Sequence, residues 1–192
     1  YNKCYYISQM SEKYKVFDSK IPHFITITVV GWVDVFTRLQ YTEILDKSLK
    51  HCIENKGLII MAYVYMTNHI HLIVKSETNE LQNIIRDFKT FTSKAIIKEI
   101  ELSNESRKVW MLKKFQKEAE RTSRTKNYKF WKDGFHPIML DKTKILEQKF
   151  DYLHQNPVLA GFVREAQDWK NSSALAYSLD NKSCANFEIV FV

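Results

Sequence analysis

The chain has 192 residues, of which 45% are hydrophobic and 14% aromatic, enough to build one folded domain and too many for a disordered chain. Four glycines and three prolines exclude collagenous and linker-rich proteins. The formal net charge of +7 permits a polyanionic partner without requiring one.

The positive charge is concentrated between residues 107 and 132. This segment holds ten basic and two acidic residues, so it carries +8 while the rest of the chain carries −1. Aromatic residues are interleaved with the cations: Trp110, Phe115, Tyr128, Phe130 and Trp131. Cations for phosphates and rings for stacking favour single-stranded or distorted nucleic acid. The alternative is a solvated basic helix whose aromatic residues are core, and Trp110 and Trp131 fit both interpretations.

The cysteine spacing and the length of the apolar runs indicate the cellular compartment of the protein. Cys4, Cys52 and Cys184 are odd in number and lack paired spacing, which favours reduced thiols over disulfides or a zinc site. The longest apolar run, residues 58–66, is too short to span a membrane. We therefore expect a cytoplasmic protein with no membrane partner.

The first half of the chain predicts three strands and two helices. Residues 23–30 are β-branched and aromatic and predict a strand. Apolar residues at helical spacing predict helices over 41–55, ended by Gly57, and over 79–100. Between them, residues 58–66 and 68–75 are joined too tightly for a crossover, so they predict an antiparallel hairpin.

The second half predicts a basic insert followed by a strand and a helix. The insert is helical in its first part and loop-like over 121–127, and residues 135–140 form a short strand. Asp141 is expected to cap the last helix, and Pro157 to end it after residue 156. Residues after 165 are polar and poorly patterned.

The resulting order, β-α-β-β-α-insert-β-α, predicts an α+β fold of the ferredoxin-like, split βαβ type. Its antiparallel sheet is expected to carry the helices on one face. We expect an N-terminal arm over 1–20, a catalytic domain over 21–165 with a basic insert at about 103–129, and a C-terminal tail over 166–192. Many functions share this fold, so its chemistry has to be read from particular residues.

His69 and His71 lie two residues apart in a predicted strand. They therefore share one face, about 7 Å apart along the backbone, while Ile70 faces the helix layer. Two imidazoles on one face can bind a divalent cation if a further ligand joins them. The alternative is a pair of surface histidines on a half-exposed strand.

Tyr152 and Asn156 share a face of the last helix because they are four residues apart. If this helix packs beside the hairpin, Tyr152 could reach a bound metal as a nucleophile and Asn156 could be the third ligand. The alternative is a tyrosine on a helix flank and an ordinary Asn-Pro helix end. A Gly-rich phosphate loop, a Gly-x-Ser-x-Gly elbow and a Cys-x-x-Cys motif are all absent from the sequence.

Three segments together resemble the single-tyrosine (Y1, HUH) transposases of the IS200/IS605 type, particularly their REP-associated branch. Residues 63–74 (YVYMTNHIHLIV) resemble the strand with a His-hydrophobic-His motif. Residues 130–136 (FWKDGFH) resemble the segment leading into the last core strand, and residues 151–158 (DYLHQNPV) resemble the tyrosine helix. The resemblance spans about residues 21–175.

The resemblance implies a DNA strand transferase. His69 and His71, with Asn156, would bind Mg²⁺ or Mn²⁺, which polarises a phosphodiester of single-stranded DNA. Tyr152 would attack the phosphorus, leaving a 5′-phosphotyrosine and a free 3′-hydroxyl, and a second 3′-hydroxyl could reseal the strand without ATP. The third ligand varies among relatives, so His154 competes with Asn156.

The resemblance also implies hairpin DNA as the partner, in the bacterial cytoplasm and at the nucleoid during action, with no protein partner. The basic insert is the expected DNA-binding segment. Its candidate DNA-binding residues are Arg107, Lys108, Lys113, Lys114, Arg121, Arg124, Lys126, Lys129 and Trp131. Mobile-element relatives act as homodimers whereas REP-associated members also occur as monomers, so both states remain open.

Two other functions remain as alternatives. A non-catalytic nucleic-acid-binding module on the same fold would need no metal and form no adduct. A phosphodiesterase acting on RNA would need two histidines on separate strands as acid and base, and these two share one strand.

Overall fold

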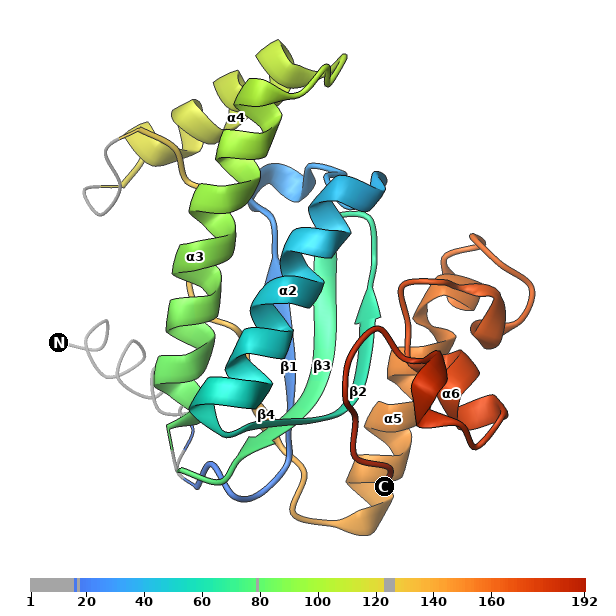
Figure 1. Ribbon diagram of the computed structural model, residues 1–192. Helices are drawn as coiled ribbons and strands as arrows, with labels where there is room; N and C mark the ends of the chain where they lie inside the picture. Colours follow the sequence, from blue (N-terminus) through green and yellow to red (C-terminus); the bar gives the residue numbers. More distant parts are fainter. Residues whose placement is uncertain (1–15, 17, 79, 123–126) are drawn as a thin grey trace, which may run out of the picture.

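The computed structural model describes residues 16, 18–78, 80–122 and 127–192 (Figure 1). The larger elements, in chain order, are β1 (His23–Thr28), α2 (Leu39–Lys56), β2 (Leu58–Tyr65), β3 (His69–Ser76), α3 (Leu81–Leu102), α4 (Lys108–Glu120), β4 (Ile138–Met139) and α5 (Thr143–Leu159). Shorter helical segments are η1 (Val30–Trp32), η2 (Ala166–Asp168), α6 (Ala174–Ser178) and η3 (Lys182–Cys184). None of the described helices is long and apolar enough to cross a membrane.

The strands form one antiparallel sheet in the order β2-β3-β1-β4, which confirms the predicted α+β class. In the central pair, Thr26 of β1 lies opposite His71 of β3, and Thr28 lies opposite His69. Because side chains alternate along a strand, this register gathers Thr26, His69 and His71 on one face. Their neighbours Ile25, Ile27, Ile70, Leu72 and Val74 are buried on the other face.

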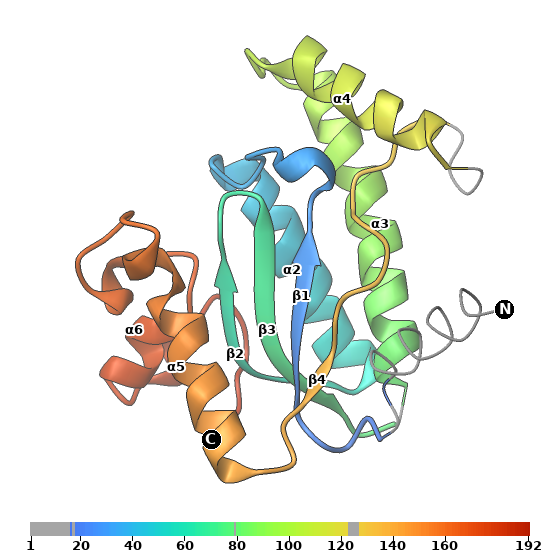
Figure 2. The same cartoon turned by 180° about the vertical axis from the view of Figure 1, so that it is seen from behind.

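Helices cover both faces of the sheet, which corrects the prediction of helices on one face. α2 and α3 pack on the face that carries Ile70 and Leu72. α5 packs on the opposite face, where Leu153 joins a second apolar cluster with Val64 and Ile73 (Figure 2). The reason is that alternate positions of β2 and β3 are apolar on both sides, so the sheet buries a second surface.

The bounds of the last helix and last strand also differ from prediction. α5 starts after Lys142, not Asp141, and continues through Pro157 to Leu159. Proline lacks an N–H and crowds the carbonyl four residues earlier, but one lost bond in the final turns does not stop the helix. β4 shrinks to Ile138–Met139, which form the ladder with β1, while Phe135 adds a single bond in which its carbonyl accepts from the Thr26 N–H.

The segment after residue 165 is more closely integrated than a tail. Ser172 forms a β-bridge with Val64, and the side chain of Ser173 accepts a hydrogen bond from the Tyr63 N–H at 3.0 Å. Further along, the Phe187 ring lies 4.6 Å from that of Tyr63. Backbone bonds to β2 and the buried Ala176, Phe187 and Ile189 hold this segment, and its apolar residues have no regular period that the sequence could reveal.

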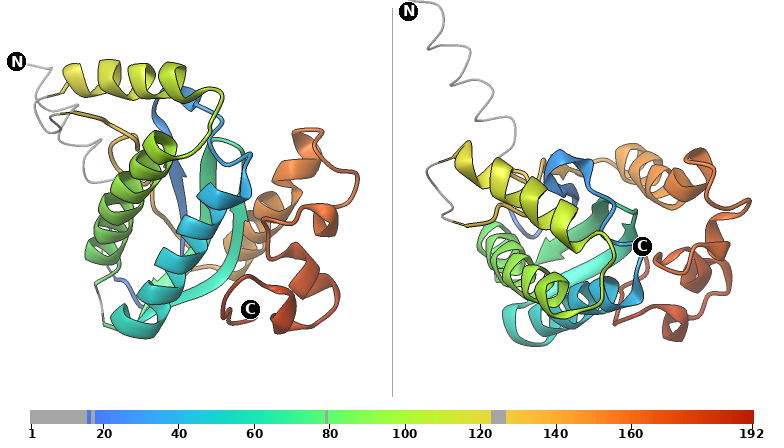
Figure 3. Two further views of the ribbon diagram at one scale, coloured as in Figure 1. Left: turned by 45° about the horizontal axis from the view of Figure 1, so that its top comes forward. Right: turned by 90° about the horizontal axis from the view of Figure 1, so that it is seen from above.

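α4, the helix of the basic insert, lies across one end of α3 (Figure 3). Its start is fixed by the buried carboxylate of Glu105, which pairs with Arg38 at 2.7 Å and with Arg107 at 3.1 Å. Arg107 also donates to the backbone carbonyl of Asp34 at 2.8 Å. The insert is therefore bound to the loop that follows β1.

Candidate active site

The two histidines of β3 form the centre of the site. Their ring centroids are 4.8 Å apart, on the sheet face opposite α2 and α3. The hydroxyl of Thr26, on the neighbouring strand, lies 2.9 Å from Nδ1 of His71. Strand alternation, which the sequence already predicted, is the reason both imidazoles point the same way.

His71 has the environment expected of a metal ligand. Its side chain is buried, and its Nε2 atom has no hydrogen-bond partner among the described residues. Burial, together with the charges of His69 and Lys149, lowers the pKa of His71 to about 3, so the imidazole is neutral at physiological pH. When Nδ1 donates to the Thr26 hydroxyl, Nε2 is unprotonated and its lone pair meets no hydrogen-bond donor in the described part of the chain. This is the form of imidazole that binds a metal.

His69 is oriented by a relay of hydrogen bonds. The carboxylate of Asp34 accepts from the amide nitrogen of Asn68 at 2.9 Å, which turns the amide oxygen of Asn68 toward His69. That oxygen lies 2.8 Å from Nδ1 of His69 and accepts a hydrogen bond from the Nδ1–H group. The relay leaves Nε2 of His69 as the unprotonated nitrogen, as in the outer shell of many metal sites. Burial, with Lys132 nearby, lowers the pKa of His69 as well.

Tyr152 enters the site from α5. Leu153 anchors the helix in the second apolar cluster, and Tyr152 beside it is 43% exposed. The Tyr152 ring centroid is 5.6 Å from that of His71 and 5.9 Å from that of Phe24. The ammonium group of Lys149 lies 5.4 Å from the centroid of the Tyr152 ring. An accessible phenol therefore lies beside both a cation and the histidine pair.

The two candidates for a third ligand are distinguished by their surroundings. His154 is buried away from the pair, with Nε2 hydrogen bonded to Ser173 at 2.8 Å and its ring against Phe150 and Tyr177. Its Nε2 is therefore already engaged, which argues against its competing role as a ligand. Asn156 is half-buried one turn after Tyr152 on α5.

The described residues fit a divalent metal, but they supply only part of its ligand shell. They contain two neutral imidazoles with free Nε2 atoms, one of them buried without a partner. Among residues 16, 18–78, 80–122 and 127–192, no group of three His, Cys, Asp or Glu side chains could hold a metal. A neutral oxygen donor, a DNA phosphate or water would have to complete the shell.

Four of the predicted DNA-binding cations form ion pairs or hydrogen bonds within the protein, three of them in or beside α4. Arg107 binds the buried Glu105, and Arg121 pairs with Glu118 at 2.7 Å. The ammonium of Lys108 donates to the carbonyl of Glu101 at 2.9 Å. Arg107 is therefore primarily structural, because releasing it would leave a buried carboxylate with less compensation.

The other candidates are divided between surface and core. Lys113 is exposed on α4, Lys114 packs over Gly31, and Lys129 pairs with Asp133 at 2.8 Å. Trp131 is only 5% exposed and donates to the Thr92 hydroxyl at 3.1 Å, so the structure places it in the core, and its DNA contact stays a prediction. Arg124 and Lys126 lie outside the described residues.

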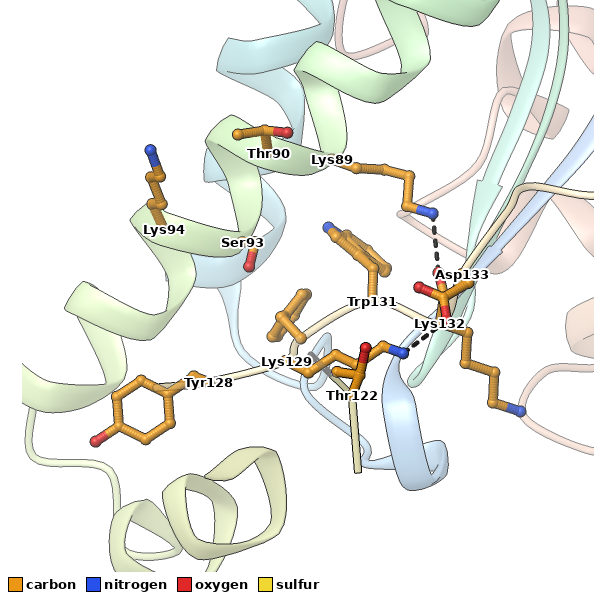
Figure 4. A pocket seen from close by; sticks show the side chains of 11 residues that line it. Lys89, Thr90, Ser93, Lys94, Thr122, Tyr128, Lys129, Trp131, Lys132 and Asp133 are labelled. Carbon is orange, nitrogen blue, oxygen red and sulfur yellow. Dashed lines mark hydrogen bonds and ion pairs between the residues drawn. The ribbon is translucent and has the colours of Figure 1, made fainter. Parts of the chain in front are cut away.

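A basic pocket of about 340 Å³ lies between α3 and residues 128–133 (Figure 4). Lys89, Lys94, Lys129 and Lys132 contribute to its lining, with Tyr128 at its edge. Lys89 donates to the carbonyls of Lys132 and Gly134, and burial lowers its pKa to about 8. The pocket thus gathers several lysine side chains between α3 and residues 128–133.

Sequence reasoning missed four residues around the site: Thr26, Asp34, Lys149 and the exposed Trp32, whose ring lies 5.9 Å from that of His69. Alternation in β1, given its pairing with β3, could have placed Thr26 on the sheet face that carries His69 and His71. The sequence contains no comparable signal for Asp34, because it acts through a loop contact.

The comparisons with known proteins agree with this geometry. The family model described as "Transposase IS200 like" matches residues 19–121, more than half of the chain, and includes both histidines but not Tyr152. The chain belongs to the IS200-like transposase family, a class of enzymes that cleave and join DNA. A search of curated proteins finds no match.

One solved transposase structure shows the same fold. A REP-associated tyrosine transposase bound to a REP hairpin matches with a TM-score of 0.63 and 18% identity, over 86% of this chain and 84% of that chain. A bacterial tRNA(His) guanylyltransferase-like protein in complex with ATP matches with a TM-score of 0.37 and 10% identity, over 96% and 80% of the two chains. The first match supports the transposase fold.

Proposed function

We propose that this chain is a divalent-metal-dependent endonuclease and strand transferase that acts on hairpin-containing single-stranded DNA, with Tyr152 as the nucleophile. The observation that carries the proposal is the accessible Tyr152 phenol beside His71, whose buried Nε2 has no partner in the described structure. Family membership supports the reaction class. The hairpin bound by the similar transposase supports the choice of substrate.

His69, His71 and Asn156 would hold Mg²⁺ or Mn²⁺. When bound, such an ion supplies Lewis-acid polarisation of a phosphodiester oxygen. The Asp34–Asn68 relay keeps Nε2 of His69 unprotonated, and the Thr26 hydroxyl orients His71. These contacts fix the orientation of both imidazoles before DNA binds.

Tyr152 would carry out the covalent step. Its phenolic oxygen loses a proton and bonds to phosphorus, while the bond to the 3′-oxygen breaks and that oxygen leaves as a hydroxyl. The product is a 5′-phosphotyrosine that retains the energy of one phosphodiester, so a second 3′-hydroxyl can displace the tyrosine. Lys149, beside the phenol, adds positive charge where the phosphodiester must approach.

The adduct is the direct test. Oligonucleotides carrying palindromes from the DNA flanking the gene, labelled at the 3′ end, are incubated with protein and Mn²⁺ and resolved on denaturing gels. The label should move with wild-type protein and not with Tyr152→Phe. Tyr177→Phe is the matched control, because that hydroxyl donates to the Met61 carbonyl and lies away from the histidine pair. An equal adduct with Tyr152→Phe would refute the nucleophile.

Metal binding tests the histidine pair separately. Titration with Mn²⁺ should show binding that is lost in the double variant His69→Ala, His71→Ala and kept in His51→Ala, a change to an exposed histidine of α2. Binding that survives the double variant would refute the metal site. Salt-sensitive DNA binding with neither adduct nor metal requirement would instead favour the non-catalytic module.

A further inference from the structure

Trp32 is held in an unfavourable conformation at the protein surface. Its side chain is 56% exposed, and its backbone has φ +54°, directly after Gly31 at φ +62°. Left-handed backbone costs a bulky residue conformational free energy, and such outliers concentrate at functional sites. The fold therefore maintains an exposed indole at a position where neither burial nor local preference favours it.

The segment around Trp32 is fixed from several sides. The N–H groups of Val29 and Val30 donate to the carbonyls of Asn68 and Phe130, each at 2.9 Å. The Trp32 N–H donates to the Val29 carbonyl at 3.2 Å. These bonds connect the Trp32 turn to the loop before His69 and to the segment that follows the basic insert, so the indole is presented on a rigid support.

Four rings follow one another across the site. The centroids of Trp32 and His69 are 5.9 Å apart, those of His69 and His71 are 4.8 Å apart, and those of His71 and Tyr152 are 5.6 Å apart. The histidine pair thus separates Trp32 from the nucleophile. A strand that follows this line of rings, with its scissile phosphate at the pair and Tyr152, would bring a neighbouring nucleotide to Trp32.

A cation completes this end of the site. The ammonium nitrogen of Lys132 lies 4.1 Å from the centroid of the Trp32 ring, and Lys132 also lines the basic pocket beside α3. The ammonium covers one face of the indole, so a base would stack on the other face while the lysine binds the attached phosphate. Stacking on an aromatic face suits any unpaired base and is not available to a base inside a duplex.

We infer that Trp32 is a stacking platform for one unpaired base next to the scissile phosphate, with Lys132 binding the adjoining backbone. The inference rests on the proposed function and adds a substrate feature, an unpaired nucleotide at a fixed distance from the cut. In this proposal Trp32 is a substrate-binding residue that contacts the DNA away from the reacting atoms.

Abasic scanning tests the platform. Hairpin oligonucleotides from the flanking DNA, each lacking one base of the unpaired segment, are titrated with Tyr152→Phe protein so that no cleavage intervenes. We expect one position at which loss of the base weakens binding about tenfold, the order of one stacked base. In the added background of Trp32→Leu the intact oligonucleotide should bind about tenfold more weakly, and that abasic penalty should disappear.

Two further variants keep the result interpretable. Trp32→Phe should restore part of the abasic penalty, because phenylalanine retains an aromatic face. Phe91→Leu, at a ring that is 59% exposed on α3 and on the other side of the sheet, should leave the penalty unchanged. A Trp32→Leu protein that keeps the full penalty, or an unpaired segment with no sensitive position, would overturn the platform. Neither outcome affects the adduct assay of Tyr152, so the two proposals fail independently.

Discussion

The buried carboxylate of Glu105 offers a quantitative test of how the basic insert is attached. Burial alone would raise the pKa of Glu105, but hydrogen bonds and charge from Arg107, with the charge of Arg38, lower it to about 2. Removing one partner of a buried ion pair costs ~3–5 kcal/mol. Both arginines are partly exposed and their charges are screened, so for Glu105→Gln we expect a loss of ~2–3 kcal/mol in the free energy of unfolding at pH 7.

The pH dependence of this loss identifies its origin. Because the folded pKa is depressed, the contribution is complete above the unfolded value near 4.5 and is lost as pH falls toward 2. The difference between wild type and Glu105→Gln should shrink by ~1.4 kcal/mol between pH 7 and pH 3.5.

Urea unfolding of both proteins at pH 7 and pH 3.5 measures the difference. Glu43→Gln is the matched control, because Glu43 forms an exposed pair with Lys47 at 3.9 Å and should cost less than ~0.5 kcal/mol. A Glu105→Gln deficit of the same size at both pH values would refute the reasoning, since it would then arise from packing and not from charge.

Further predictions concern the relay and the C-terminal segment. Asp34→Ala should lower Mn²⁺ affinity by ~10–100-fold in titration calorimetry, because the amide of Asn68 would no longer be oriented toward His69; unchanged affinity would show that the relay is dispensable. Ser173→Ala should lower the free energy of unfolding by ~1–3 kcal/mol, because it leaves His154 without its buried partner and removes a bond to Tyr63; a neutral result would mean that residues 166–192 contribute little. Chelation of divalent ions should abolish the adduct without unfolding the protein, as followed by circular dichroism.

The parts that the sequence predicted well depend on periodic patterns. Alternation placed His69 and His71 on one face and Ile70 on the other, and helical spacing located α2 and α3. Four-residue spacing put Tyr152 and Asn156 on one side of α5, whose packing beside the hairpin then became visible in the structure.

The parts that the sequence did not reveal depend on contacts between distant segments. Asp34 reaches His69 through Asn68 across a loop, and Ser173 bonds to Tyr63 across 110 positions. Composition also could not distinguish a core indole from an exposed one. Trp131 is buried, whereas Trp32, which lies outside the basic segment, faces solvent beside the histidines.

The most direct measurement is the identity of the residue that carries DNA. Trypsin cuts after Lys149 and Arg164, and peptide 150–164 contains Tyr152 as its only tyrosine. Nuclease and trypsin digestion of the wild-type adduct, followed by mass spectrometry, should find the 5′-linked nucleotide on Tyr152 in this peptide. A nucleotide on another tyrosine, or cleavage that leaves no tyrosine-linked nucleotide, would contradict the proposed mechanism.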